Sequence, residues 1–172
     1  DTETLETVVT QTYGVELVTP QSQQALPNEQ IQYSIKVVNK GNGIDTVALE
    51  IIQKPSGWSV SLSSPSVTLD AKKNTTITLT VRSPCTEKNI IGEIKIKGTS
   101  QGNATKTHEI IISTEIRQVF SVSLSVQNNI QYVNKGGSAN YLIILKNNGN
   151  GQDSFVLEVN NPKSTQWQGQ LS

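Results

Sequence analysis

The chain has 172 residues, of which 34% are hydrophobic and only 5% aromatic, and its 14 basic residues balance its 14 acidic ones. A neutral chain with no Lys/Arg cluster beyond Lys72 and Lys73 lacks the electrostatic footprint of a nucleic-acid-binding protein. No apolar run approaches the ~18 residues that cross a bilayer, so we expect any membrane anchor to lie outside this sequence.

Residues 1–12 carry the pattern of a strand that ends a domain. The stretch LETVVTQTYGVELV (5–18) resembles a stretch near residue 120, with Tyr13 standing over Phe120. We therefore interpret residues 1–12 as the last strand of a preceding repeat, or as a linker.

The next hundred residues alternate apolar and polar side chains in short segments separated by turn signals. Such period-two patterning predicts half-buried antiparallel strands, and no helical pattern persists over ten residues. About seven strands in this length indicate an all-β fold with an immunoglobulin-like β-sandwich, although the Cys and Trp pattern of antibody domains is missing. We expect one core to hold Ile35, Leu49, Val60, Leu79 and Ile94. The strands are predicted at 30–38, 45–51, 58–63, 74–82, 92–98 and 107–114.

One phrase occurs twice. NKGNGIDTVALEI begins at Asn39, and NNGNGQDSFVLEV begins 108 positions later at Asn147. This period is far longer than a solenoid repeat and matches one small β-sandwich. The sequence therefore predicts tandem domains, with an immunoglobulin-like sandwich at 13–119 and the first half of a second, truncated one at 120–172.

The repeated phrase is expected to be a turn between two strands. Gly41 and Gly43 would supply positive φ angles, which Asn42 also tolerates. Asp45 would accept hydrogen bonds from nearby amides and fix the loop.

The second copy is expected to expose the apolar face of half a sandwich. Its early strands have counterparts in the first copy, but it has no counterpart of residues 66–84 or of the later strands of the first copy. A two-layer core needs both layers, so either missing C-terminal residues or strands from another molecule must cover this half. The first option implies a window cut from a longer array.

The turn, its flanking strands, the Pro55–Gly57–Trp58 step and the segment 66–84 together resemble the Ig-like repeats of archaeal and bacterial cell-surface proteins. These include the cell-adhesion-related (CARDB-like) repeats and similar repeats of envelope and S-layer proteins. The resemblance implies a domain type and not an activity. The loop that contains Cys85, Glu87 and Lys88 departs from that pattern.

Residues that could carry chemistry are few. The only histidine, His108, has no serine nucleophile motif or metal-spaced cysteines beside it, and Cys85 would need a base to act as a nucleophile. We therefore expect no catalytic residue, no cofactor and no enzyme activity. Asp45 and Asp153 are weak calcium candidates, because each turn offers one carboxylate where Ca²⁺ takes six to eight oxygen ligands.

Two further kinds of surface site are open. Asn74 and Asn103 begin glycosylation sequons, NTT and NAT. Trp58 and Trp167 could stack on a sugar, but their place next to a strand favours a core or domain-contact role.

These patterns favour a structural role. The chain would be the repeat region of an extracellular cell-surface protein, such as an S-layer, a surface filament or an adhesin stalk. Its domains would act as spacers or lattice formers that contact neighbouring repeats of the same chain and self-associate. The alternative is a non-catalytic carbohydrate- or protein-binding module appended to a secreted enzyme, which should show an exposed aromatic cluster on one face.

Overall fold

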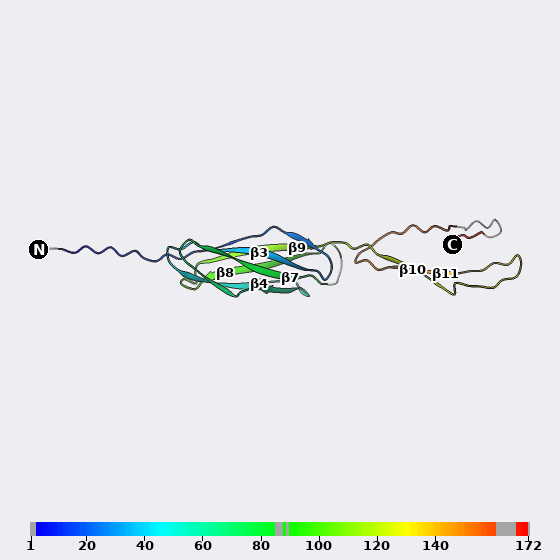
Figure 1. Ribbon diagram of the computed structural model, residues 1–172, viewed down its shortest axis with the longest axis horizontal. Coiled ribbons are helices and arrows are strands. Elements are labelled where there is room, and N and C mark those ends of the chain that lie inside the picture. Colours follow the sequence, from blue (N-terminus) through cyan, green and yellow to red (C-terminus); the bar gives the residue numbers. More distant parts are fainter. Residues whose placement is uncertain (1–2, 85–87, 89, 161–167, 172) are drawn as a thin grey trace. The chain divides into compact units, whose positions relative to one another are not determined.

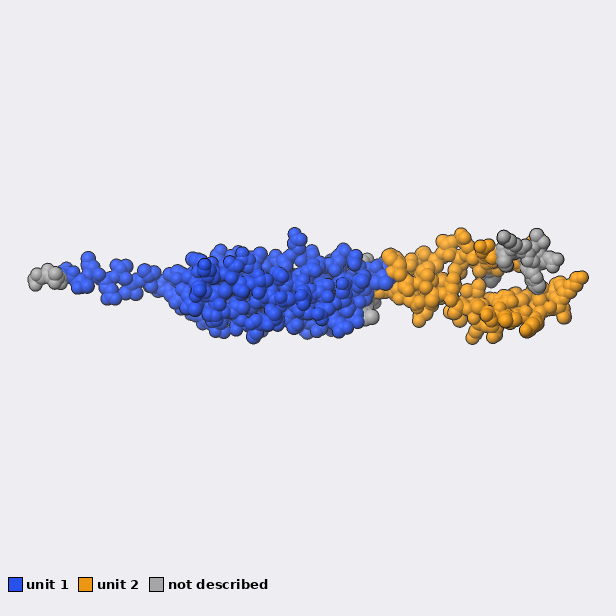
Figure 2. All heavy atoms as spheres, in the orientation of Figure 1, with its two compact units in different colours: residues 1–119 blue, residues 120–172 orange. Residues whose placement is uncertain are grey.

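The structure is a computed structural model that describes residues 3–84, 88, 90–160 and 168–171. The chain divides into two compact units, Asp1–Val119 and Phe120–Ser172, which are drawn in different colours in Figure 2. The described residues contain no helix, and therefore none that could span a membrane.

The described residues of unit 1 form nine strands in two sheets (Figure 1). The first sheet has the order β1-β3-β7-β5 and the second the order β2-β9-β8-β4-β6. The strands are β1 (Val15–Val18), β2 (Gln23–Ala25), β3 (Gln30–Asn39), β4 (Asp45–Gln53), β5 (Ser59–Leu62), β6 (Ser66–Leu69), β7 (Asn74–Arg82), β8 (Ile91–Ser100) and β9 (Thr107–Ile116).

The beginning of the chain contributes to both sheets. β1 pairs antiparallel with β3 in the first sheet, and β2 pairs parallel with β9 in the second. All the other strand pairs of unit 1 are antiparallel. The N-terminal segment thus crosses from one layer to the other and joins the two sheets at their edges.

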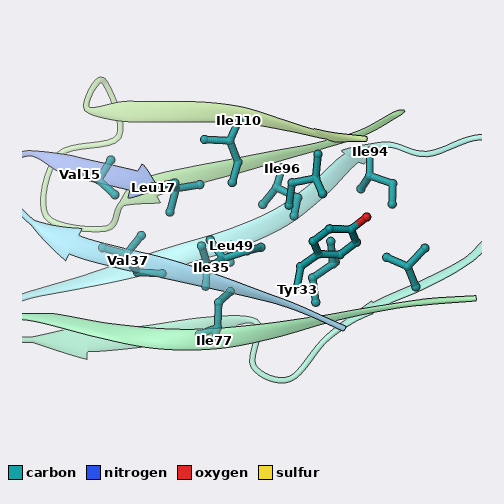
Figure 3. Packing of buried hydrophobic residues seen from close by; sticks show 14 of the residues in the cluster. Val15, Leu17, Tyr33, Ile35, Val37, Leu49, Ile77, Ile94, Ile96 and Ile110 are labelled. Carbon is teal, nitrogen blue, oxygen red and sulfur yellow. The ribbon is translucent and has the colours of Figure 1, made fainter. Parts of the chain in front are cut away.

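The core lies between the sheets and confirms the predicted alternation (Figure 3). In β3, Tyr33, Ile35 and Val37 are fully buried, whereas the polar residues between them are exposed. The β-branched and aromatic side chains of this face suit a pleated, buried surface. The buried apolar residues are Val15, Leu17, Ala25, Tyr33, Ile35, Val37, Val47, Leu49, Trp58, Leu69, Ile77, Leu79, Val81, Ile94, Ile96, Ile110, Ile112 and Ile116. Val60, which was expected inside, is half-buried and packs against this cluster. The fold class is all-β, an immunoglobulin-like β-sandwich.

The described residues of unit 2 form one antiparallel strand pair, β10 (Val122–Gln127) with β11 (Leu142–Asn147). It repeats the register of β1 with β3: Val15 lies opposite Asn39, and Val122 lies opposite Asn147. Every residue of β10 and β11 is exposed. The apolar face expected from the sequence is therefore uncovered, with Tyr141 45% and Ile143 46% exposed.

Two segments expected to be strands are not strands here. Residues 155–159 correspond to β4, but they have no strand structure. In unit 1, β4 is held by β6 and β8, and the described part of unit 2 has no counterpart of either. The described residues before β1, from residue 3 to residue 14, also form no strand, because no strand lies beside residues 3–9 to pair with them.

Candidate functional site

The centre of the repeated turn is Asn39, a residue that the sequence patterns did not single out. It ends β3 with none of its surface exposed. Its Nδ2 donates to the carbonyl oxygens of Gly43 (2.8 Å), Leu69 (3.0 Å) and Asp70 (3.1 Å). Its Oδ1 accepts from the Gly41 amide at 2.8 Å. One buried amide group therefore closes the turn and joins it to the end of β6.

The same turn is built in unit 2. Asn147 Nδ2 donates to the Gly151 carbonyl at 2.8 Å, and the Gly149 amide donates to Asn147 Oδ1 at 2.8 Å. These two bonds match those of Asn39 to Gly43 and Gly41, residue by residue. The signal in the sequence was the pairing of Asn39 with Asn147, which is less conspicuous than the glycines and the aspartate around it.

The expected role of the glycines was wrong. Gly41 and Gly43 do not have positive φ; among the described glycines only Gly57 and Gly136 do. The non-glycine residues with positive φ do not include Asn42 either. The turn excludes side chains because another segment approaches it closely. A Cβ on Gly41 would lie 2.5 Å from the Thr12 carbonyl oxygen.

That approaching segment is the chain just before β1, and residues 41–44 hold it. We call residues 41–44 the linker clamp. Asn42 Oδ1 accepts from the Thr12 amide at 2.6 Å, and Asn42 Nδ2 donates to the Thr10 carbonyl at 3.1 Å. The Asn42 amide also donates to the Thr12 carbonyl at 3.2 Å. Gln11 Nε2 donates to the Ile44 carbonyl at 2.9 Å. The clamp thus binds residues 10–12 largely through their main-chain groups, as an added strand would be bound.

Asp45, at the start of β4, follows the clamp and bonds to the loop between β8 and β9. It is 6% exposed. The Ser100 hydroxyl donates to Oδ2 at 2.5 Å, and the Gly102 amide donates to Oδ1 at 3.1 Å. Asp45 therefore fixes the loop between β8 and β9, and not its own turn as the sequence suggested. That loop lies under the linker, since a Cβ on Gly102 would overlap the ring of Tyr13.

The two calcium candidates, Asp45 and Asp153, do not belong to a cluster of possible metal ligands among the described residues. Asp153 Oδ1 accepts from the Ser154 amide at 2.7 Å. Within the described residues, no group of three or more His, Cys, Asp and Glu side chains lies together in a way that could hold a metal ion. Asp45 and Asp153 each meet hydrogen-bond donors of the protein.

His108 has a structural contact. It is exposed on β9, and its Nδ1 accepts from the Leu17 amide at 3.3 Å, which joins β9 to β1. Near it, Lys40 Nζ lies 2.9 Å from Glu16 Oε2, and this hydrogen bond and charge lower the pKa of the exposed Glu16 carboxyl. Cys85 and Trp167 lie outside the described residues.

The remaining candidates are Trp58 and the two sequon asparagines, Asn74 and Asn103. Trp58 is 4% exposed and packs its ring over Gly92, so it does not offer a face for a sugar. Asn74 is exposed at the start of β7. Asn103 lies in the β8–β9 turn, where its Oδ1 accepts from the Thr105 amide (3.1 Å) and hydroxyl (2.7 Å).

Comparisons with known proteins find structures of similar fold but no family. No protein-family model matches the chain, and a search of curated proteins finds no match. A PapD-like domain of human CEP192 is 12% identical over 67% of this chain and 95% of that one, with a TM-score of 0.48. A chaperone–tip adhesin complex of CFA/I fimbriae biogenesis is 15% identical over 80% and 70%, with a TM-score of 0.45. The class 5 fimbriae chaperone CfaA is 14% identical over 80% and 68%, with a TM-score of 0.42. These similarities concern the fold alone.

The two clamp glycines should respond differently to a methyl group. Gly41→Ala should destabilise unit 1 by about 2 kcal/mol, because its Cβ meets the Thr12 carbonyl at 2.5 Å and backbone must move. Gly43→Ala should cost less than about 1 kcal/mol, because its Cβ meets the flexible Gln11 side chain at 2.7 Å. Chemical denaturation of both variants measures the loss in free energy of unfolding. Equal losses would show that the close contact with the Thr12 carbonyl is not the reason for glycine at position 41.

Proposed function

We propose that the chain is a non-catalytic structural repeat region of an extracellular cell-surface protein, in which immunoglobulin-like units act as spacers. The observation that supports this is the linker clamp. A free polar linker samples many directions, and adjoining domains move relative to each other unless contacts fix them. Hydrogen bonds from residues 41–44 to residues 10–12 give the incoming chain one direction relative to unit 1.

The repetition of the turn supports a role shared by successive units. Asn39 and Asn147 form the same two bonds within their own turns, so the chain contains the asparagine-centred turn twice. The resemblance to CARDB-like, S-layer and adhesin repeats fits such a spacer, with neighbouring repeats and further copies of the chain as its partners. Asn74 and Asn103 are the positions where a surface glycan would be tolerated.

The alternative, a carbohydrate- or protein-binding module, is less well supported. Sugar-binding faces commonly use exposed aromatic rings, because these present a large apolar surface with little side-chain entropy to lose. The aromatic residues of unit 1 are Tyr13, Tyr33 and Trp58. Tyr33 is fully buried, Trp58 is 4% exposed and Tyr13 is half-buried beside the loop at Gly102. An exposed aromatic cluster is therefore not found in the described part of unit 1, whereas unit 2 exposes Phe120 (68%), Tyr132 (96%) and Tyr141 (45%).

Removing the clamp side chain should release the linker without unfolding the domain. In the wild-type protein, amide ¹⁵N relaxation should show residues 10–12 ordered like β1 and residues 3–9 more mobile. Asn42→Ala should bring Thr10 and Thr12 to the mobility of residues 3–9, because two of the bonds that hold them are lost.

The matched control is Asn74→Ala, which removes an exposed asparagine that lies opposite Val38 in the pairing of β3 with β7 and does not bond to residues 10–12. It should leave residues 10–12 ordered. If residues 10–12 of the wild-type protein are as mobile as residues 3–9, the clamp is refuted.

The location is tested separately. An antibody against unit 1 should label intact source cells, and labelling only after lysis would refute the surface role.

A further inference from the structure

Asn42, the residue that holds the linker in the clamp, is followed by a glycine. Because glycine has no Cβ, its main-chain nitrogen can come close to the side-chain amide carbon of the asparagine before it. That nitrogen can attack the carbon and expel the side-chain amide as ammonia, a reaction called deamidation. Whether such a pair reacts depends on how the fold holds its two groups. The sequence contains three Asn–Gly pairs, Asn42–Gly43, Asn148–Gly149 and Asn150–Gly151.

The main-chain nitrogen of Gly43 is not held by a hydrogen bond. Gly43 lies in the turn between β3 and β4, and its carbonyl accepts from Asn39 Nδ2 at 2.8 Å. Its N–H donates to no residue in the described part of the chain. In unit 2, by contrast, the Gly149 N–H donates to Asn147 Oδ1 at 2.8 Å. The fold therefore leaves the attacking group of the Asn42–Gly43 pair unbonded.

The side-chain amide of Asn42 is bonded only to the linker. Its Oδ1 accepts from the Thr12 amide at 2.6 Å and its Nδ2 donates to the Thr10 carbonyl at 3.1 Å, and the described residues give this side chain no other partner. Asn42 is exposed, so water reaches it. The attack makes the planar amide carbon tetrahedral and removes Nδ2, so these two bonds do not fit the reacting geometry. Deamidation of Asn42 therefore requires the linker to leave the clamp briefly.

The linker also covers the attacking group. The Gln11 side chain lies over Gly43, since a Cβ on Gly43 would lie 2.7 Å from Gln11 Cδ and 2.8 Å from its Nε2. The same side chain is fixed by its hydrogen bond from Nε2 to the Ile44 carbonyl at 2.9 Å. Residues 10–12 thus shield both reacting groups of the pair, and the rate of the reaction depends on how often the clamp opens.

We propose that Asn42 is a site of spontaneous deamidation, and that this modification opens the linker clamp permanently. The Gly43 nitrogen loses its proton to solvent and forms a bond to Asn42 Cγ, and the Cγ–Nδ2 bond breaks with release of ammonia. Water then opens the cyclic succinimide at either of its carbonyls and leaves aspartate or isoaspartate. The net change consumes water and releases ammonia, so the reaction needs no oxidant and no enzyme.

Either product loses the contacts that Asn42 makes. An ionised carboxylate accepts hydrogen bonds but cannot donate one. The oxygen that replaces Nδ2 would face the Thr10 carbonyl oxygen, so an attraction becomes a repulsion. Isoaspartate also lengthens the main chain by one carbon beside Gly41, where the Thr12 carbonyl leaves no room for a Cβ. Deamidation therefore makes a transient opening of the clamp irreversible.

The consequence concerns the direction of the linker. A clamped linker gives the incoming chain one direction, whereas a released polar linker samples many. A spacer built from such units would be stiff when newly made and would become flexible with age. This consequence rests on the proposed function, whereas the reaction itself rests only on Asn42, Gly43 and the linker residues that cover them.

Peptide mapping by mass spectrometry of the purified 172-residue chain, incubated in neutral buffer, tests the reaction. Asn42 should convert to aspartate and isoaspartate, and the conversion should be about tenfold faster in urea, where the two bonds to the linker are lost. No conversion of Asn42 in the folded chain, over a time in which the chain in urea converts completely, would overturn the proposal. Equal rates in the two conditions would overturn the shielding by the clamp.

Two variants assign the rate to the clamp and to the glycine. Gln11→Ala uncovers Gly43 and removes the hydrogen bond to Ile44, so it should speed the conversion of the folded chain about threefold. Gly43→Ala should slow the conversion about tenfold in urea as well as in buffer, because a Cβ hinders the attacking nitrogen. An unchanged rate in Gln11→Ala would contradict the shielding, and an unchanged rate in Gly43→Ala would contradict attack by the Gly43 nitrogen.

The effect on the linker is measured by amide ¹⁵N relaxation. Asn42→Asp supplies the aspartate product directly, and both this variant and an aged wild-type sample should bring Thr10 to the mobility of residues 3–9. Asn74→Asp adds the same charge to an exposed asparagine that does not bond to residues 10–12, and it should leave them ordered. A fully converted sample with residues 10–12 still ordered would refute the opening of the clamp.

The outcomes also separate this modification from the function proposed above. If residues 10–12 are mobile in freshly prepared wild-type protein, the clamp itself is refuted. If Asn42→Asp releases the linker but Asn42 of the folded wild-type chain does not convert, the clamp stands and only the deamidation is refuted.

Discussion

Asn39→Ala should be among the most destabilising single changes in unit 1, lowering its free energy of unfolding by about 3–5 kcal/mol. The change removes four hydrogen bonds and leaves the Gly41 amide and the carbonyls of Gly43, Leu69 and Asp70 without this partner. Each buried polar group left unsatisfied costs about 1–3 kcal/mol, although water entering the space recovers part of it. Urea denaturation followed by circular dichroism measures the loss.

Asn42→Ala is the matched control, because Asn42 lies three positions further on but its amide group is exposed. It should cost less than about 1 kcal/mol, as is usual for surface changes. Asn39→Asp separates shape from hydrogen bonding. It keeps the size of the side chain but turns an oxygen toward the three carbonyls, and it should cost at least as much as alanine. Similar small losses in Asn39→Ala and Asn42→Ala would contradict the central role of Asn39.

The faces of the strands could be predicted because the alternation of side chains is a property of each strand alone. Alternating side chains point to opposite sides, so the run from Tyr33 to Val37 has one apolar face whatever its partners are. The choice of partner is a different matter. The sequence of β4 is repeated at 155–159, yet only the first copy is a strand, because pairing depends on β6 and β8.

The sequence predicted a structural turn at this position, but not which contacts hold the turn. The repeat drew attention to residues 39–51, and the site lies there. A glycine in a sequence signals either a positive φ or the lack of a Cβ, and nothing local distinguishes the two. At Gly41 the decisive atom is the carbonyl of Thr12, which lies far earlier in the chain. The partners of Asn39 and Asp45 are equally remote in the chain, at Leu69 and Ser100.

The kind of contact that a residue makes was predicted better than the partner that it contacts. Asp45 was expected to accept amide hydrogens, and it accepts one from Gly102, but its position on a neighbouring hairpin depends on the pairing of β4 with β8. Trp58 was expected in the core or in a contact, and its burial agrees with the apolar pattern of the segment it begins. The glycine that makes room for its ring, Gly92, cannot be recognised from any local pattern.

Gly92→Ala should destabilise unit 1 by about 2–3 kcal/mol, which is the range for overpacking a closed core. Its Cβ would lie 2.5 Å from Cζ2 and 2.6 Å from Cη2 of Trp58, whose ring is rigid and almost completely buried. Relief requires the ring or β8 to move, and β8 is paired with β9 at Gly92 and with β4 from Lys95 onward. Thermal and urea denaturation monitored by circular dichroism measure the loss.

Gly98→Ala, on the same strand, controls for the change of glycine to alanine itself. Its Cβ would meet the side chain of Leu17 at 3.1–3.3 Å, a milder overlap than the 2.5 Å at Gly92, so its cost should stay below about 1 kcal/mol. Alanine also lowers the entropy of the unfolded chain, which offsets part of that cost. Trp58→Phe removes the outer ring that Gly92 accommodates. In that background Gly92→Ala should cost clearly less than it does alone, and this coupling assigns the loss to the ring contact. Equal costs at the two glycines, or no coupling with Trp58, would show that this packing needs Gly92 for its backbone and not for the space it leaves.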